Sequence, residues 1–190
     1  KAIKRIRDIA AELLDIYARR AARLGHNFHW PESEYRSFSP EFPFELTEDQ
    51  AQTIDEVLKD LQSRKPMDRI VCGDVGFGKT EVALRASFAV VNGGKQVAVL
   101  VPTTLLAQQH GQTFKDRFSN WPVHIEVLSR FQTNKEVERI IYGLKTGKVD
   151  IVIGTHRLLR YTKDFANIGL AIIDEEHRFG VKQKESIKSL

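Results

Sequence analysis

The residues best suited to chemistry in this 190-residue sequence lie between Gly73 and Thr80. The segment Gly73-Asp-Val-Gly-Phe-Gly-Lys-Thr80 fits the pattern G-x-x-x-x-G-K-[ST], between an apolar run and a helical pattern. Glycines let such a loop wrap closely, so that backbone N–H groups and a helix N-terminus point at phosphate oxygens. We expect it to bind a nucleotide through Gly73, Asp74, Val75, Gly76, Phe77, Gly78, Lys79, Thr80 and Glu81, with Lys79 on the β- and γ-phosphates and Thr80 on Mg²⁺.

A second group of polar residues follows an apolar run near the end of the sequence. Leu170-Ala-Ile-Ile predicts a strand, and Asp174 and Glu175 come directly after it. A parallel strand delivers its last side chain to the edge where a phosphate loop also lies, so we expect Asp174 to ligate Mg²⁺. Glu175 is then placed to orient or deprotonate the attacking water. Lys79, Asp174 and Glu175 are the expected catalytic residues; the alternative for the acidic pair is a solvated turn.

These groups need a sheet to position them. Short β-branched runs, each followed by enough residues for a helix, occur at Arg69 to Cys72, Gln96 to Val101, His124 to Leu128, Val149 to Ile153 and Leu170 to Ile173. Strands alternating with helices predict an α/β fold with a parallel sheet. Thr47-Glu-Asp-Gln50 and Thr133-Asn-Lys-Glu136 match the capping box that begins a helix, and Asn92-Gly93-Gly94 predicts the end of the helix that starts near Lys79.

The chain divides into three parts. Apolar residues at helical spacing predict one helix over residues 1–25, either packed on its own domain or connecting two domains. Residues 26–43 contain three prolines, three serines and five aromatics without a sustained period, which indicates a linker on the surface. Residues 44–190 form the expected ATP-binding domain, in which the C-terminal part is incomplete.

The composition, 42% hydrophobic and 28% charged, is that of a soluble globular protein. The sequence has neither a long apolar run nor a secretory signal, and one cysteine makes neither an internal disulfide nor a zinc site, so we expect a cytoplasmic protein without a membrane partner. The net charge of +4 lies entirely in residues 1–24, which carry seven basic and three acidic side chains. Any argument for a nucleic-acid partner must therefore depend on individual residues.

The two motifs together resemble those of the superfamily 2 helicases and translocases, whose acidic motif is D-E-x-H or D-E-x-D. The segments Pro102-Thr-Thr-Leu-Leu-Ala-Gln-Gln-His110, Gly154-Thr-His-Arg-Leu-Leu159 and Asp174-Glu-Glu-His-Arg-Phe-Gly-Val181 are similar to the first motor domain shared by RecG and the bacterial transcription-repair coupling factors. Phe77, the Thr-Thr-Leu-Leu after Pro102, and Met67-Asp-Arg-Ile-Val-Cys72 favour the coupling factors, as does the pattern of the first helix.

The resemblance implies a three-layer RecA-like P-loop domain with a parallel sheet, preceded by a connector helix. It implies an ATP- and Mg²⁺-dependent double-stranded DNA translocase that displaces stalled RNA polymerase and recruits an excision-repair damage-recognition protein. In such motors Thr103, Thr104, Arg130, Thr155 and His156 contact DNA phosphates, although helix capping also explains Thr103 and Thr155. Glu176 and His177 link the γ-phosphate site to the DNA-binding elements. Gln50 either contacts adenine, with Phe44 stacking on the ring, or only completes its capping box.

Three other interpretations stay open: a fork-remodelling translocase like RecG, a nucleotide-gated protein-interaction module, and a small-molecule phosphotransferase. The last of these leaves the acidic pair and the DNA-contacting turns unexplained. The Ser/Thr-Ala-Thr motif and the second RecA-like domain of a complete motor are absent from this sequence, which is expected to be part of a longer protein. We therefore expect the chain alone to bind nucleotide weakly and hydrolyse it slowly, because transition-state stabilisation is missing.

Overall fold

The computed structural model describes residues 24–74 and 76–175. The helix expected at the N-terminus, apart from its last two residues, and the expected site residues Val75, Glu176 and His177 lie outside these ranges. Within the described part of the chain, no helix combines the length and the apolar character needed to cross a bilayer.

A four-stranded parallel sheet forms the centre of the described fold. It consists of β1 (Gln96–Leu100), β2 (Ile125–Leu128), β3 (Ile151–Gly154) and β4 (Ile168–Ile173), in the spatial order β2-β3-β1-β4. Val97 of β1 lies opposite Ile151 of β3 on one side and Leu170 of β4 on the other. Four of the five predicted strands and the parallel sheet are therefore confirmed.

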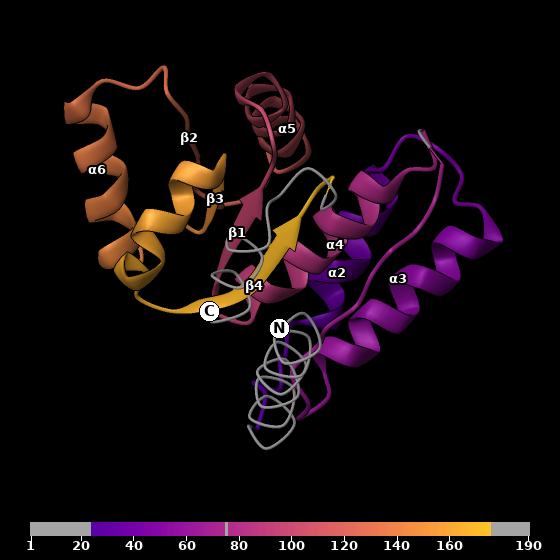
Figure 1. Cartoon of the computed structure of the whole chain (residues 1–190). Helices are drawn as coiled ribbons and strands as arrows, with labels where there is room; N and C mark the ends of the chain where they lie inside the picture. Colours follow the sequence, from indigo (N-terminus) through magenta and orange to yellow (C-terminus); the bar gives the residue numbers. More distant parts are fainter. Residues whose placement is uncertain (1–23, 75, 176–190) are drawn as a thin grey trace, which may run out of the picture.

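Helices cover both faces of this sheet. They are α2 (Glu32–Phe38), α3 (Glu48–Leu61), α4 (Lys79–Asn92), α5 (Thr104–Arg117) and α6 (Asn134–Lys145), with two 3₁₀ segments, η1 (Ser39–Glu41) and η2 (His156–Asp164). In Figure 1, α6 and η2 lie on one side of the strands, and α4 and α3 lie on the other. The three-layer α/β fold is therefore confirmed.

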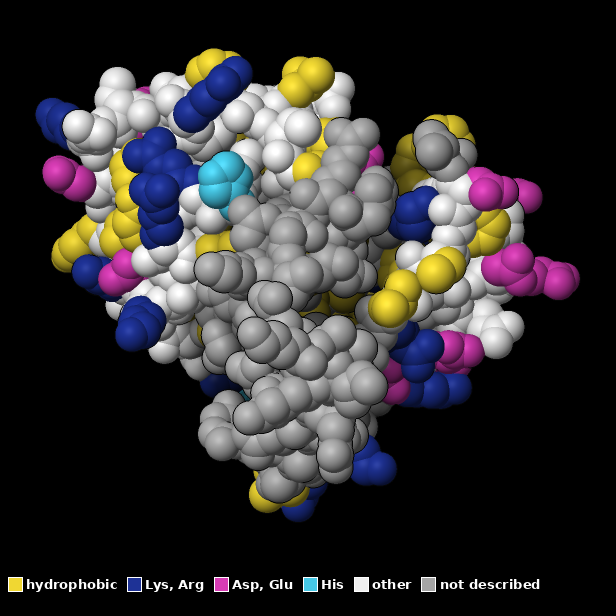
Figure 2. Space-filling view, in the orientation of Figure 1, with side chains coloured by type: hydrophobic (Ala, Val, Ile, Leu, Met, Phe, Trp, Pro, Cys, Tyr) yellow, Lys and Arg dark blue, Asp and Glu magenta, His cyan; other side chains and the backbone are white. Residues whose placement is uncertain are grey.

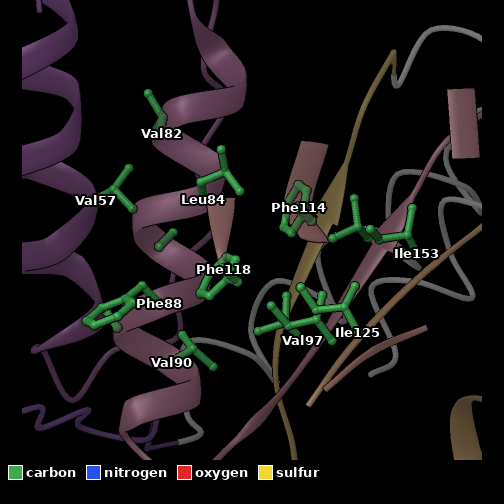
Figure 3. Packing of buried hydrophobic residues seen from close by; sticks show 14 of the residues in the cluster. Val57, Val82, Leu84, Phe88, Val90, Val97, Phe114, Phe118, Ile125 and Ile153 are labelled. Carbon is green, nitrogen blue, oxygen red and sulfur yellow. The ribbon is translucent and has the colours of Figure 1, made fainter. Parts of the chain in front are cut away.

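The alternation of side chains along β1 explains the two cores. Val97 and Val99 point into a large cluster with residues of α3, α4 and α5, whereas Ala98 and Leu100 point into a smaller cluster with α6 and η2. Successive strand residues face opposite sides of a sheet, so a strand buried on both faces is apolar throughout. Figure 3 shows the larger cluster, with Phe88 on α4 and Phe114 and Phe118 opposite it.

Local sequence chemistry sets the ends of the helices as predicted. Thr47 and Gln50 form a complete capping box at the start of α3, and Thr133 and Glu136 form another at the start of α6. Helix α4 ends at Asn92, and Gly94 beyond it has a φ of 77°, which glycine adopts without strain.

Residues 26–43 differ from the expected surface linker. They contain α2, and Phe28 and Phe38 belong to the larger core cluster. The ring of Phe38 stacks on that of Phe88, with centroids 4.1 Å apart. Aromatic rings bury more apolar area than any other side chains, so this short segment is part of the hydrophobic core.

The predicted strand from Arg69 to Cys72 is wrong: these residues form no strand and are largely exposed. Arg69 instead makes ion pairs with Glu56 and Asp60 of α3, at 2.5 and 2.7 Å. These contacts place Arg69 beside α3, and residues 69–72 pair with none of the described strands. In the described structure β4 accordingly pairs with β1 alone.

Candidate nucleotide and DNA sites

The phosphate loop ends in backbone suited to binding an anion. Gly76 and Gly78 have φ angles of 87° and 71°, in the left-handed region that favours glycine. Gly78 precedes the first residue of α4, and no described side chain caps this helix start. The Glu81 N–H donates to Gly78 O at 2.9 Å, and the N–H groups of Lys79 and Thr80 are suited to bind phosphate oxygens, with the positive end of the helix dipole behind them.

Lys79, the first residue of α4, curls back over the loop. Its Nζ donates hydrogen bonds to the carbonyl oxygens of Gly73 and Asp74, the second at 2.8 Å. Its charge also contributes to lowering the pKa of Asp174. The structure therefore brings the lysine of the phosphate loop and the first residue of the acidic motif into one electrostatic environment, as the sequence predicts.

Asp174 lies at the carboxyl end of the sheet, where its backbone N–H donates to Leu100 O at the end of β1, at 2.9 Å. Its Oδ2 lies 2.8 Å from Nε2 of His110 on α5, and its Oδ1 accepts a hydrogen bond from the Glu175 N–H at 3.0 Å. The hydrogen bond with His110 is the main reason why the pKa of Asp174 lies below its ordinary value, against the opposing effect of partial burial. The carboxylate is thus kept ionised, which is the form that binds a cation.

The described residues suit a nucleotide carrying Mg²⁺. The uncapped start of α4 and Lys79 offer donors and positive charge to phosphates. The Asp174 carboxylate and the Thr80 hydroxyl offer hard oxygen ligands. No group of three or more His, Cys, Asp or Glu side chains that could hold a metal occurs among the described residues. This small donor set is typical of Mg²⁺ shared between one or two carboxylates and substrate phosphates.

A cavity of about 480 Å³ lies beside the phosphate loop. Gly78 and Thr80 line it together with Phe42 and Pro43. Phe44, the aromatic residue predicted to stack on adenine, is 72% exposed and is not among the lining residues. Its ring packs edge-on against Phe42, with centroids 5.5 Å apart. Phe42, two residues earlier, is the phenylalanine that lines this cavity, and contact of Phe44 with adenine stays a prediction.

Gln50 uses both ends of its amide within the protein. Its Oε1 accepts from the Thr47 N–H at 2.9 Å, which completes the capping box of α3. Its Nε2 donates to Phe77 O at 2.6 Å, inside the phosphate loop. The capping interpretation therefore describes Gln50 as it stands, with an additional contact to the loop that the capping box alone did not predict.

Glu81 has a structural role in the described fold. Its carboxylate is 2% exposed and pairs with Arg85 at 2.8 Å and with Arg117 at 3.2 Å. The same two arginines donate to Ser39 and to the carbonyl of Phe38. This network, which we call the Glu81 network, ties α4 to the residues that precede the phosphate loop. Its place in the phosphate-loop motif had suggested a nucleotide contact instead.

The predicted DNA contacts come together in one groove of about 590 Å³. Thr103, Thr104, Arg130, Thr155 and His156 all line it, although they follow three different strands. Parallel strands end at the same edge of the sheet, and this explains why the three turns meet. Gln108, Phe131, Arg157 and Arg160 also line the groove. Figure 2 shows dark blue basic side chains gathered over η2, which carries two of these arginines.

The two threonines for which capping was an alternative behave differently. The Thr103 hydroxyl accepts a hydrogen bond from the Leu106 N–H at 3.2 Å, as an N-cap residue does. Thr155 precedes η2 without any side-chain cap bond. Helix capping therefore explains why residue 103 is a threonine. It does not explain Thr155, whose hydroxyl makes no capping hydrogen bond at the start of η2.

The turn that carries Arg130 is fixed to its neighbours. Gln132 Oε1 accepts from both the backbone N–H and the hydroxyl of Ser129, and Arg157 donates to Ser129 O at 3.3 Å. At the end of β3, a Cβ on Gly154 would lie 2.8 Å from Leu128 O. The strand ends are therefore in close contact beneath the groove.

A sequence model of the DEAD/DEAH box helicases matches residues 47–190. The chain belongs to this family.

Similar proteins include the transcription-repair-coupling factors of Haemophilus influenzae, 60% identical over the whole chain, and of Escherichia coli, 58% identical. The chain spans 17% of the length of each. A solved structure of RecG bound to a three-way DNA junction covers 87% of this chain and 23% of its own, with 39% identity and a TM-score of 0.81. The UvsW helicase of bacteriophage T4, 18% identical with a TM-score of 0.61 over 87% of this chain and 57% of its own, shows the fold alone.

Two sets of residues in this DEAD/DEAH box helicase domain were not predicted from the sequence. Arg157 and Arg160 lie in the segment after Gly154, and their spacing of three residues, which puts two side chains on one face of a helical turn, is a signal that could have found them. His110 lies 64 residues before Asp174, and only the folded structure brings the two together. The other site residues could be predicted because each motif is continuous in the chain.

Proposed function

We propose that this chain is the first RecA-like motor domain of an ATP-driven translocase that moves along double-stranded DNA. The observation that carries the proposal is the presence of two sites at one edge of the sheet: the phosphate loop with Asp174, and the groove that contains all five predicted DNA contacts. The family match and the likeness to RecG, whose structure holds a DNA junction, support it. A nucleotide-binding module without DNA would leave the groove unexplained.

The nucleotide chemistry follows from the positions of four residues. Lys79 neutralises the β- and γ-phosphates, while the N–H groups of the first turn of α4 hold their oxygens. Thr80 and Asp174 would hold Mg²⁺, which would supply positive charge to the phosphoryl group that is transferred. Glu175 orients and deprotonates the attacking water. Arginines from a second motor domain complete the stabilisation of the transition state, and without them we expect slow turnover.

The DNA chemistry is that of a backbone contact. The groove offers threonine hydroxyls, the N–H groups of turns, and the guanidinium groups of Arg130, Arg157 and Arg160. These groups position a phosphate backbone and carry no base-specific pattern. Such binding suits a motor that moves along DNA of any sequence.

The biological setting is a further part of the proposal. Identity of 53–60% to transcription-repair-coupling factors supports a role in transcription-coupled repair, with stalled RNA polymerase and an excision-repair damage-recognition protein as partners and the cytoplasm as the location. The likeness to RecG favours fork remodelling as the second candidate. Two assays on the complete protein that contains this chain separate the two candidates: one measures displacement of a stalled RNA polymerase, and the other measures regression of a model replication fork.

The substitution Glu175→Gln tests the assigned chemistry in the complete protein. We expect ATP turnover to fall by about 100-fold or more, because a general base contributes that much, while nucleotide binding persists. Glu138→Gln, an exposed glutamate on α6, is the matched control and is expected to leave turnover unchanged. Turnover of Glu175→Gln equal to that of the control would refute the role of Glu175. Failure of double-stranded DNA to stimulate the unmodified protein would refute the translocase.

A further inference from the structure

Helix α5 contacts both sites of the domain. Its N-cap Thr103 and its first residue Thr104 line the DNA groove. His110, six residues further along, places Nε2 2.8 Å from Oδ2 of Asp174. A helix rises about 1.5 Å per residue, so roughly 9 Å of rigid backbone separates the groove from the carboxylate that is to hold Mg²⁺.

The Asp174 carboxylate is held at both of its oxygens. Oδ1 accepts from the Glu175 N–H, and Oδ2 faces His110, whose side chain is 16% exposed. A carboxylate held in this way keeps one orientation, and each oxygen retains a lone pair for a cation or its water. Of these two contacts, only that with His110 comes from a different element of the fold.

The face of α5 that carries His110 is packed against the sheet. Ala107, Gly111 and Phe114 are buried on the helix face that carries His110. A Cβ on Gly111 would lie 2.3 Å from Cγ2 of Val127 on β2, so the helix rests directly on the sheet. A shift of its N-terminal residues towards a DNA phosphate is therefore transmitted along the helix axis to His110.

We propose that His110 is a positioning residue that orients Asp174 for Mg²⁺ and couples this orientation to DNA bound at the start of α5. The inference rests on the proposed function, because it requires that Asp174 holds Mg²⁺ with a nucleotide. It assigns to α5 a coupling role additional to that expected of Glu176 and His177. Ligands of this kind depend on the neighbours that orient them, and losing such a neighbour commonly weakens metal binding tenfold or more.

The test measures binding of a fluorescent ATP analogue to the complete protein, in Mg²⁺ and in EDTA, with and without a DNA duplex. His110→Phe keeps a ring in place and removes the hydrogen bond. We expect it to weaken binding in Mg²⁺ by about tenfold, to leave binding in EDTA unchanged, and to abolish the effect of DNA on Mg²⁺-dependent affinity. His110→Gln, whose amide can donate to Asp174, should restore most of the affinity in Mg²⁺ and most of the effect of DNA on it. The control His124→Phe removes a histidine–carboxylate pair with Glu126 at the start of β2 and should change neither.

Four results would overturn the inference. His110→Phe that binds like the unmodified protein shows that the contact has no effect, and equal weakening in Mg²⁺ and EDTA shows a merely structural role. Failure of His110→Gln to recover shows that the hydrogen bond is not what matters. If the unmodified protein binds the ATP analogue equally well in Mg²⁺ and in EDTA, the proposed function fails together with the inference. The first three results overturn the inference alone. If circular dichroism shows that His110→Phe does not fold, His110→Asn, whose shorter amide falls short of Asp174, carries the same test.

Discussion

The Glu81 network makes the sharpest prediction about stability. Glu81 is 2% exposed and faces two arginines, Arg85 and Arg117, whose side chains are each 8% exposed. Arg117 also pairs with the carboxylate of Glu41 at 3.1 Å and lies 3.7 Å from the ring centroid of Phe38. Glu81 is therefore the more deeply buried of the two carboxylates that balance these guanidinium groups.

The substitution Glu81→Gln keeps the volume of the side chain and removes its charge. Breaking a buried ion pair by removing one partner costs about 3–5 kcal/mol, because the remaining charge is left uncompensated. Arg117 keeps Glu41, and Arg85 keeps its hydrogen bonds with Ser39 and Tyr35, so we expect the lower end, about 3 kcal/mol. For a chain of this size such a loss lowers Tm by roughly 6–12 °C.

Thermal and urea denaturation of the chain without nucleotide, followed by circular dichroism, measure this loss. The control is Glu32→Gln, which removes an ion pair with Arg36 on α2 in which both side chains are more than half exposed. Exposed pairs contribute no more than about 1 kcal/mol, so the control should change Tm little. An equal change in Tm for Glu81→Gln and Glu32→Gln would show that the network does not stabilise the fold and would refute the reasoning.

Two further predictions concern a buried carboxyl group and the groove. Burial raises the pKa of the Asp150 carboxyl group, although the hydrogen bond from the His124 N–H opposes this effect. The folded chain therefore binds the carboxyl proton more tightly than the unfolded chain does. The free energy of unfolding consequently falls as pH rises through the folded pKa. The substitution Asp150→Asn keeps an acceptor for that hydrogen bond but removes the charge, so it should raise Tm at neutral pH and leave Tm in acid unchanged. A Tm below that of the unmodified chain at neutral pH would contradict this prediction. Arg160→Ala should weaken DNA binding equally for all sequences and reduce the slope of log affinity against log salt by about 1, whereas a sequence-dependent loss would contradict a backbone contact.

The parts of the fold that were predictable are those fixed by neighbouring residues. The capping boxes of α3 and α6 depend on residues three apart, and the strands β1 and β3 depend on continuous β-branched runs. Residues 69–72 contain a shorter apolar run, Ile70 to Cys72, which forms no strand in the fold, and Arg69 pairs with acidic residues of α3, a contact that the local sequence does not show. The burial of Phe38 was hidden because α2 has only seven residues, too few to show a period.

The candidate site divides in the same way. Lys79, Asp174 and the turns of the groove belong to continuous motifs, so residue types and spacing were enough to find them. The contact of His110 with Asp174 spans 64 residues and exists only because α5 lies beside the end of β4. Phe42 lines the cavity beside the phosphate loop and Phe44 does not, and residue type and spacing alone do not choose between these two nearby rings.

The close contact of strand ends at Gly154 has a consequence for how the groove can vary. A Cβ there would lie 2.8 Å from the backbone oxygen of Leu128 and 3.1 Å from the Leu158 side chain. One added methyl group would push apart the strands whose following turns carry Arg130 and Thr155, which both line the groove. The distance between these two groove residues therefore depends on the absence of a side chain at Gly154, a residue that does not itself line the groove.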